Sequence, residues 1–445
     1  MPLYTRVLTT ADYGIVDLIV QTANLLIPVV SAGISNSVIR FGLDRSVRKS
    51  DVFSTGLRTV FTGFLIFLLL YPFSDKLPFL SEHTLLIYLY VLASCLRGIC
   101  SQFTKSLGLV RLYAFDGIFS TFMVVAFNIT FLVGLGWGIT GYILSTILSD
   151  FLSSCFLFST ARLYKFVKLN GIKKSTRRAM LRYSVPLIPT TIFWWITNVS
   201  DRYLVSYMLG SDANGLYAVS YKIPTIVILI SGIFIDAWQI SAVSETDRYE
   251  RERFFTKVFG VYQSIVFLTS SGLIAFCKLI TMILVSEAFY PSWQYIPFLV
   301  MSTAFSCFVT FLGTVYMVEK CSVMNLATTI IGAVINLILN IKLIPVYGVT
   351  GAAFATFFSY FAVFFIRAVD TRRFLKIDFN VLKLSANLFI ITVQSIVIMA
   401  SPPRWILMQA ALVSLMFLLN FRDIMLSVYK LLGKFLGRKN RRLAQ

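Results

Sequence analysis

The feature that most constrains this chain is a series of long apolar segments separated by short polar connections. A helix needs about 20 mostly apolar residues to cross the hydrocarbon core of a bilayer. Thirteen segments meet this requirement, at 14–39, 52–71, 84–104, 112–134, 139–161, 184–208, 215–240, 258–285, 293–318, 323–344, 348–366, 380–400 and 405–421. The sequence therefore predicts an all-α polytopic membrane protein with no soluble domain.

The composition agrees with this interpretation and excludes several classes of protein. Of the 445 residues, 57% are hydrophobic and 13% are charged, and the mean hydropathy is +0.80. A soluble domain carries about 25% charged residues. A soluble enzyme, a nucleic-acid-binding protein and a disordered chain are therefore excluded for the whole molecule. Because His83 is the single histidine and the six cysteines form no CxxC motif, we expect no metal site, no catalytic triad and no cofactor.

The distribution of basic residues predicts the orientation in the membrane. Cytoplasmic loops of membrane proteins carry an excess of Lys and Arg. With thirteen spans, the connections on one side hold 30 of the 40 basic residues, and those on the other side hold three, namely Arg6, Lys76 and Arg404. The basic side includes the segment 162–183 and the tail 422–445. We therefore expect a cytoplasmic C-terminus.

The odd number of spans has a consequence for the start of the chain. If the C-terminus is cytoplasmic, thirteen spans place residues 1–13 outside. These residues do not have the composition of a signal peptide. We therefore expect an additional helix upstream of Met1, which would bring the number of spans to fourteen.

Two internal similarities indicate a duplication. Leu8–Ile15 resembles Leu209–Leu216 at an offset of 201, and Gly138–Thr146 resembles Gly348–Thr356 at an offset of 210. A duplicated unit of six helices contains an even number of spans, so both copies would have the same orientation. Transporters are often built from such parallel repeats, with the substrate site between them. The alternative is a chance similarity of glycine-flanked turns.

At this point a family resemblance becomes specific. The segment Asp201–Gly210 (DRYLVSYMLG), followed by Gly215–Pro224 (GLYAVSYKIP), resembles the middle of the Wzx-type polysaccharide-lipid flippases of the MOP (multidrug/oligosaccharidyl-lipid/polysaccharide) superfamily. Leu8–Gly14 and Gly33–Phe41 resemble the end of their first helix and their second helix. The resemblance covers essentially the whole chain and implies a MATE-like fold. In that fold two six-helix lobes form a V around a central cavity, and members have 12 or 14 helices with both termini in the cytoplasm.

The resemblance also implies a division of this chain into five parts. These are an N-lobe, a basic cytoplasmic linker, a C-lobe, two extra C-terminal helices and a basic cytoplasmic tail, at 1–161, 162–183, 184–366, 367–421 and 422–445. Helices 1, 2, 7 and 8 of the family line the cavity. Here they correspond to a missing or truncated first helix, followed by 14–39, 184–208 and 215–240.

Twelve ionisable residues inside the expected spans indicate a hydrated interior. A charged side chain at mid-helix costs roughly 2.5–3.5 kcal/mol on insertion scales and needs a partner or water. Five of the twelve lie near span ends and are expected to reach the interface: Asp17, Asp116, Asp236, Lys342 and Lys383. Arg97 and Asp150 lie deeper and are expected to pair with each other.

Arg202 and Lys222 are the first candidates for substrate contacts, because they lie on two adjacent spans that the resemblance assigns to the cavity. A lipid-linked sugar carries its charge on a pyrophosphate. Arginine offers a planar fork of donors to phosphate oxygens, and lysine offers a point charge. Arg97 and Arg40 are further candidate phosphate contacts.

Two carboxylates complete the set of candidate site residues. Asp201 and Asp150 are candidates for coupling or structural carboxylates. Asp201 is adjacent to Arg202 but points about 100° away around the helix. The alternative for Asp201 and Arg202 is a salt bridge between helices that holds the lobe together.

Together these features predict a flippase that moves undecaprenyl-pyrophosphate-linked oligosaccharide units across the cytoplasmic membrane by alternating access, for a surface polysaccharide such as O-antigen or capsule. An ion-coupled multidrug antiporter and a lipid II flippase are the alternatives. An enzyme is disfavoured because the largest outer connection, 72–83, has no paired carboxylates, and the absence of a phosphate-binding loop motif disfavours an ATP-driven pump. The expected partners are the lipid-linked oligosaccharide, the bilayer and the polymerases or glycosyltransferases of the pathway, without nucleic acid.

Overall fold

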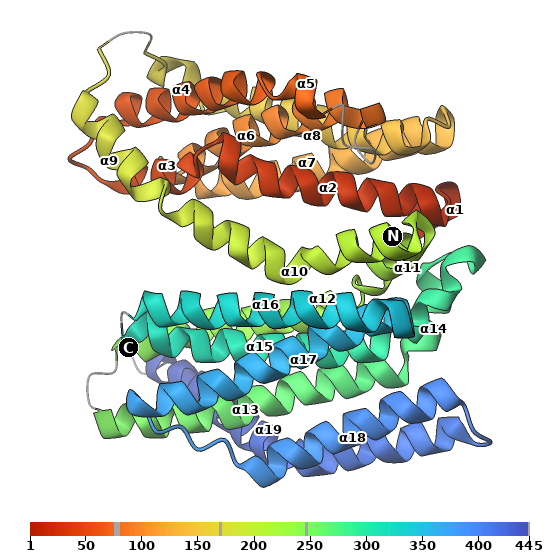
Figure 1. The fold of residues 1–445 in the computed structure, drawn as a ribbon. Coiled ribbons are helices and arrows are strands. Elements are labelled where there is room, and N and C mark those ends of the chain that lie inside the picture. Colours follow the sequence, from red (N-terminus) through yellow and green to blue (C-terminus); the bar gives the residue numbers. More distant parts are fainter. Residues whose placement is uncertain (75–80, 169–170, 245–247, 320, 444–445) are drawn as a thin grey trace. The chain divides into compact units, whose positions relative to one another are not determined.

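The computed structural model of the protein is built from helices, and no strand occurs in the part of the chain that it describes (Figure 1). That part comprises residues 1–74, 81–168, 171–244, 248–319 and 321–443, with side chains undescribed at 73–74, 81, 236–237, 239–244, 248, 317, 322, 424 and 426–443. The chain divides into an amino-terminal unit, Leu3–Tyr203, and a carboxyl-terminal unit, Leu204–Gln445 together with Met1–Pro2.

The amino-terminal unit contains the first ten α-helices, the last of which extends past its boundary. They are α1 (Pro2–Val7), α2 (Thr10–Val30), α3 (Ile34–Leu43), α4 (Lys49–Leu68), α5 (Tyr71–Ser74), α6 (Thr84–Ser106), α7 (Val110–Asn128), α8 (Gly138–Thr160), α9 (Lys174–Ser184) and α10 (Leu187–Leu209). A π-helical turn, Ile129–Gly134, extends α7.

A break between α2 and α3 divides the first expected span into two helices. At its start, α2 has a capping box, in which Thr9 Oγ1 accepts a hydrogen bond from the Asp12 amide and the Asp12 carboxylate accepts one from the Thr9 amide. At its end, Pro28 removes one helical donor. The Gly33 amide then donates to the Pro28 carbonyl at 2.8 Å. Gly33 has a φ of 59°, a left-handed conformation that glycine adopts without strain.

Close helix approaches and stacked aromatic rings hold this unit together. A Cβ added to Gly63 on α4 would lie 1.9 Å from the carbonyl oxygen of Val30 on α2, so only glycine permits this contact. The buried rings of Phe53 on α4 and Phe103 on α6 stack with their centroids 4.6 Å apart. The result is a core that fixes α2, α4 and α6 to one another.

Within the residues that the structure describes, the carboxyl-terminal unit contains nine further α-helices. They are α11 (Ser211–Ser220), α12 (Thr225–Ser244), α13 (Arg248–Ala275), α14 (Cys277–Leu284), α15 (Ile296–Val318), α16 (Ser322–Tyr347), α17 (Val349–Asp370), α18 (Val381–Ala400) and α19 (Trp405–Leu443). Its core is rich in aromatic residues, and the fully buried rings of Phe259, Tyr262 and Phe311 contact one another.

The number of expected spans, thirteen, is approximate. In the described part of the chain, eleven helices are long and apolar enough to cross a membrane, and the pair formed by α11 and α12, bent by 41°, makes a twelfth. The remaining expected span, 184–208, corresponds to α10. This helix has 23 residues but is less apolar, because Asn198, Asp201 and Arg202 lie on it.

The expected lobe boundaries stay predictions. The two units meet between Tyr203 and Leu204, inside α10, whereas the sequence places the start of the second lobe at 184. Most of α10 is grouped with the first unit because its side chains contact α2, as described below. The expected basic tail continues α19 as a helix to Leu443, and residues 444–445 lie outside the described part.

Candidate functional site

A polar network joins α6, α7 and α8 in the amino-terminal unit. The Arg97 guanidinium lies 2.8 Å from Asp150 Oδ1 and 4.0 Å from Asp116 Oδ2. Ser94 donates to Asp150 and Ser153 donates to Asp116, each at 2.5 Å. Ser94 and Arg97 are three residues apart on α6, as are Asp150 and Ser153 on α8, so each helix presents both members of its pair on one face. The expected pairing of Arg97 with Asp150 is confirmed.

The charges of this network do not cancel. The side chains of Asp150 and Asp116 are only 7% and 2% exposed, whereas that of Arg97 is 31% exposed. Two carboxylates face one guanidinium, so the network has a formal charge of −1 when both are ionised. A bound proton or a second cation would neutralise it. Arg97 can give its full fork of donors to a phosphate only by leaving a carboxylate.

A second ion pair joins α2 to α10. Arg202 Nη1 donates to Asp17 Oδ1, and the two side chains are 10% and 5% exposed. The neighbouring Asp201 is also buried, and its carboxylate accepts a hydrogen bond from the Arg202 amide at 2.9 Å. The structure therefore places Arg202 against a carboxylate of another helix.

Three further side chains extend the contact between α2 and α10. The hydroxyl of Tyr203 lies 2.7 Å from Thr22 Oγ1 and donates to the Leu18 carbonyl at 3.3 Å. Two turns earlier on α10, the indole N–H of Trp195 donates to the Gln21 carbonyl at 2.9 Å. Together with the ion pair, these hydrogen bonds fix the rotation of α10 against α2.

The expectation that charges near span ends reach the interface is wrong for three residues. Asp17 and Asp116 are buried and bind the arginines described above. Lys383 on α18 forms an ion pair with Asp423 on α19. Position along a span does not show which way a side chain points around the helix, and in these cases it points to a neighbouring helix. The side chain of Asp236 lies outside the described part.

The remaining predicted site residues lie on separate elements. Arg40 on α3 contacts α9, where its guanidinium lies 4.8 Å from the ring centroid of Tyr183. Such cation–π contacts suit an exposed arginine at a helix end. Lys222 belongs to the carboxyl-terminal unit and lies at the bend between α11 and α12, where it is exposed. Within the amino-terminal unit, Arg40, Arg97 and Arg202 each have their own partners and do not form one cluster.

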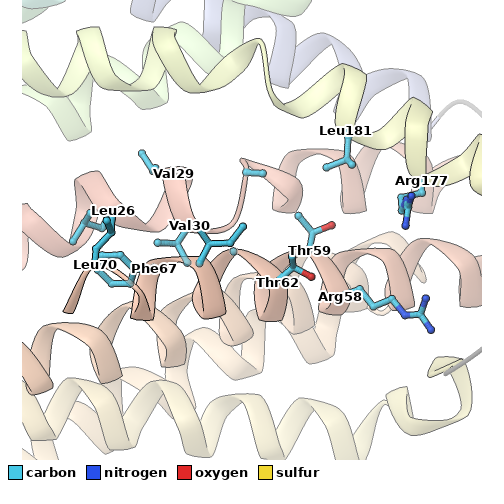
Figure 2. A pocket seen from close by; sticks show the side chains of 13 residues that line it. Leu26, Val29, Val30, Arg58, Thr59, Thr62, Phe67, Leu70, Arg177 and Leu181 are labelled. Carbon is cyan, nitrogen blue, oxygen red and sulfur yellow. The ribbon is translucent and has the colours of Figure 1, made fainter. Parts of the chain in front are cut away.

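A cavity of about 680 Å³ opens between α2, α4 and α9 of the amino-terminal unit (Figure 2). Arg58 on α4 and Arg177 on α9 lie at one end of it, and Leu26, Phe67 and Leu70 lie at the other. Within the described residues, neither arginine forms an ion pair with a carboxylate. The cavity is therefore basic at one end and apolar at the other.

The local sequence explains the shape of this cavity. Thr59 and Thr62 follow Arg58 on the face of α4 that lines it, one turn apart, and provide hydroxyls between its two ends. Gly63 lies on the same face and brings α4 against Val30. The break after α2 then directs α3 away from the direction of α2, which leaves space beside the junction.

Arg58 lies inside the expected span 52–71, and Arg177 lies in the expected basic linker 162–183. The sequence pattern alone does not connect these two residues. The sequence contains one signal that could have singled out Arg58 and Arg177: no acidic residue lies within three positions of either.

Arg367 lies one residue past the expected span 348–366. In the structure it lies at the end of α17, is 4% exposed, and donates to the carbonyls of Val309 and Asn325 at 2.8 and 3.2 Å. All its acceptors are neutral, which is typical of a structural link between helices.

Comparisons with known proteins agree with this architecture. Residues 1–239, more than half of the chain, match the family described as polysaccharide biosynthesis protein. An uncharacterized membrane protein of Methanocaldococcus jannaschii is 24% identical over 264 residues, which are 54% of this chain and 59% of that protein. The match thus spans less than two thirds of the length of that relative.

Two solved structures have the same fold. The lipid II flippase MurJ, in an inward closed conformation, superposes with a TM-score of 0.71 at 15% identity over 95% of each chain. A multidrug resistance MATE family transporter of the MOP superfamily, in an inward-facing conformation, gives a TM-score of 0.67 at 14% identity over 83% of this chain and 92% of its own. The expected MATE-like fold is thus confirmed, and the chain belongs to the polysaccharide biosynthesis protein family.

Proposed function

We propose that this protein is a flippase that carries oligosaccharide units linked to undecaprenyl pyrophosphate across the cytoplasmic membrane, with its C-terminus in the cytoplasm. The observation that carries this proposal is the family match over residues 1–239, which includes the whole amino-terminal unit and its charged groups. The cargo has an anionic headgroup on a long hydrocarbon chain. The cavity with Arg58 and Arg177 has the complementary charge and an apolar end.

We assign the phosphate contacts to Arg202 and Lys222, with Arg97 and Arg40 as secondary cations. Asp201 and Asp150 are the carboxylates that couple or orient. Arg202 is bound to Asp17 in the structure. Alternating access requires helices to separate on one side of the membrane, and separation of α10 from α2 would free Arg202 for a phosphate. A buried arginine that loses its carboxylate needs another anion, because an unpaired buried charge is strongly unfavourable.

The first experiment measures export in a strain that lacks its own polysaccharide flippase. Expression of this chain should relieve the accumulation of undecaprenyl-linked repeat units on the cytoplasmic side. Arg202→Lys should keep partial export, because the charge remains and only the fork is lost. Arg202→Gln and Lys222→Gln should stop it at normal protein abundance. Normal export by both Gln variants would contradict the assignment of these two residues.

A charge exchange separates a substrate contact from a structural salt bridge. The double variant Asp17→Arg/Arg202→Asp keeps an ion pair between α2 and α10 but moves the cation to the other helix. If Arg202 only holds the helices together, the exchange should restore export relative to Arg202→Asp alone. If Arg202 binds phosphate, export should stay lost although the protein is folded, as measured by its thermal unfolding midpoint. Restored export would refute the phosphate assignment.

The same strains distinguish the alternative cargoes. A lipid II flippase would rescue a strain depleted of its peptidoglycan-precursor flippase and would not relieve the accumulation of polysaccharide repeat units. A multidrug antiporter would lower the accumulation of cationic dyes in cells. We expect no change in dye accumulation, because the proposed headgroup-binding residues are cations and an organic cation would require carboxylates in their place. The headgroup of lipid II is anionic like that of the proposed cargo, so the rescue experiment decides between these two.

A further inference from the structure

The cavity between α2, α4 and α9 is lined by none of the residues to which the phosphate contacts are assigned. Arg58 and Arg177 lie at one end and Leu26, Phe67 and Leu70 at the other, with Thr59 and Thr62 between them (Figure 2). Of the apolar residues, Leu26 and Phe67 lie on α2 and α4, two helices long and apolar enough to cross a membrane, and Leu70 lies just past the end of α4. A ligand that fits this cavity has an anionic head and a hydrocarbon tail.

The position of Arg58 favours one class of anionic lipid. It is the tenth residue of α4, which places it about 13 Å along the helix axis from Lys49, near the middle of the helix. The phosphate of a bulk phospholipid stays at the membrane interface, where the basic linker already offers many cations. An arginine at mid-depth is costly unless an anion or water reaches it. A headgroup that is itself drawn into the membrane during transport meets this requirement.

The two arginines also suit a headgroup with two phosphates. A guanidinium can offer a planar fork of donors to one phosphate group, and the two arginines come from different helices, α4 and α9. Neither is neutralised by a carboxylate in the described part of the chain, in contrast to Arg97 and Arg202. Arg177 lies in the basic segment 162–183, which the charge distribution predicts to be cytoplasmic. The basic end of the cavity would therefore face the leaflet from which the cargo is collected.

We propose that this cavity is a loading site for the polyprenyl pyrophosphate part of the cargo, before the headgroup reaches Arg202 and Lys222. Arg58 and Arg177 bind the pyrophosphate, Thr59 and Thr62 donate to its oxygens, and Leu26, Phe67 and Leu70 contact the first isoprene units. This inference rests on the proposed flippase function and adds to it a site that is separate from the α2–α10 contact.

Binding of polyprenyl pyrophosphate to the purified full chain tests the site directly. The variant Arg58→Gln/Arg177→Gln should bind this lipid at least about tenfold more weakly than the parent, as expected for the loss of two charge-assisted contacts. Arg178→Gln is the matched control, because it removes the same charge from the next position of α9 and does not line the cavity. Insertion should survive, since loss of a mid-span charge lowers the cost of insertion.

Several outcomes would overturn the proposal. Equal binding by the double variant and the control would remove the site. Competition by phosphatidylglycerol as strong as that by polyprenyl pyrophosphate would show that the cavity holds bulk anionic lipid instead. In cells, the double variant should export less than the parent when substrate is limiting, and its export should rise when more substrate is supplied. Export by Arg202→Gln should not rise with more substrate. If the parent chain relieves no accumulation, the proposed function is wrong. If the parent chain exports and the double variant exports equally well, the proposed function stands and the loading-site proposal alone is wrong.

Discussion

Arginines that link helices in this protein are held in two chemically different ways. Arg97 and Arg202 bind carboxylates on neighbouring helices, whereas Arg367 binds neutral carbonyl and hydroxyl groups. A carboxylate partner can be exchanged for a phosphate or can take up a proton, so the first kind of contact is suited to change during transport. Neutral acceptors offer no such alternative. The sequence predicted the pair of Arg97 with Asp150 from their similar depth, but the partner of Arg202 lies 185 residues away and depth alone could not identify it.

At the residue scale, we expect Arg97→Gln to destabilise the amino-terminal unit by about 3 kcal/mol, because it leaves Asp116 and Asp150 without a cation. Adding Asp150→Asn should recover part of this loss, since one of the two uncompensated charges is removed. The measurement is the thermal unfolding midpoint of the purified protein in detergent. Arg111→Gln, which removes an exposed arginine from α7, is the control, and an equal effect of both single variants would contradict the prediction.

At the scale of elements, hydropathy located nearly every span but not its internal breaks. The helix break after α2 depends on a left-handed Gly33 and on the Pro28 carbonyl that accepts the hydrogen bond of the Gly33 amide, and both residues lie inside an otherwise continuous apolar segment. Helix α10 shows the opposite case, a continuous helix that hydropathy underrates. It is 23 residues long, but its charged residues lower its hydropathy. Both departures lie beside the α2–α10 contact or the cavity, and departures from local sequence rules are typical of functional or strained sites.

The close approach of α4 to α2 gives a test at this scale. In Gly63→Ala the new Cβ would lie 1.9 Å from the Val30 carbonyl oxygen, a backbone atom that cannot rotate away. We expect a loss of about 1–3 kcal/mol in stability, as for overpacked cores, together with weaker binding of polyprenyl pyrophosphate because the cavity changes shape.

The matched control for this test is Gly117→Ala on α7. A Cβ at Gly117 has no heavy atom within 4 Å, and alanine is the better helix former by about 1 kcal/mol. This variant should therefore be neutral or slightly stabilising. Unchanged unfolding midpoints and lipid binding in Gly63→Ala would show that α4 can move away from α2 without consequence.

At the scale of the whole molecule, the family resemblance predicted the MATE-like fold, and hydropathy and charge predicted a polytopic membrane protein and its orientation. The connections on one side hold 30 basic residues and those on the other side hold three. A missed or extra span would move later connections to the wrong side and remove this asymmetry, so the charge distribution tests all spans at once. The division into units was less predictable, because the unit boundary depends on which helix face of α10 is occupied. Hydropathy carries no information on which face of α10 is occupied. That depends on contacts between residues far apart in the sequence, such as Asp17 and Arg202.

Orientation is the property of the whole molecule on which the loading proposal depends. In a background without the six native cysteines, Ser211→Cys at the start of α11 should react with a membrane-impermeant maleimide in intact cells. Ser175→Cys on α9 should react only after the membrane is permeabilised, because α9 belongs to the basic segment 162–183. Permeabilisation controls for the accessibility of both thiols. The opposite pattern would place Arg177 and the basic end of the cavity outside, where it could receive the headgroup only after transport.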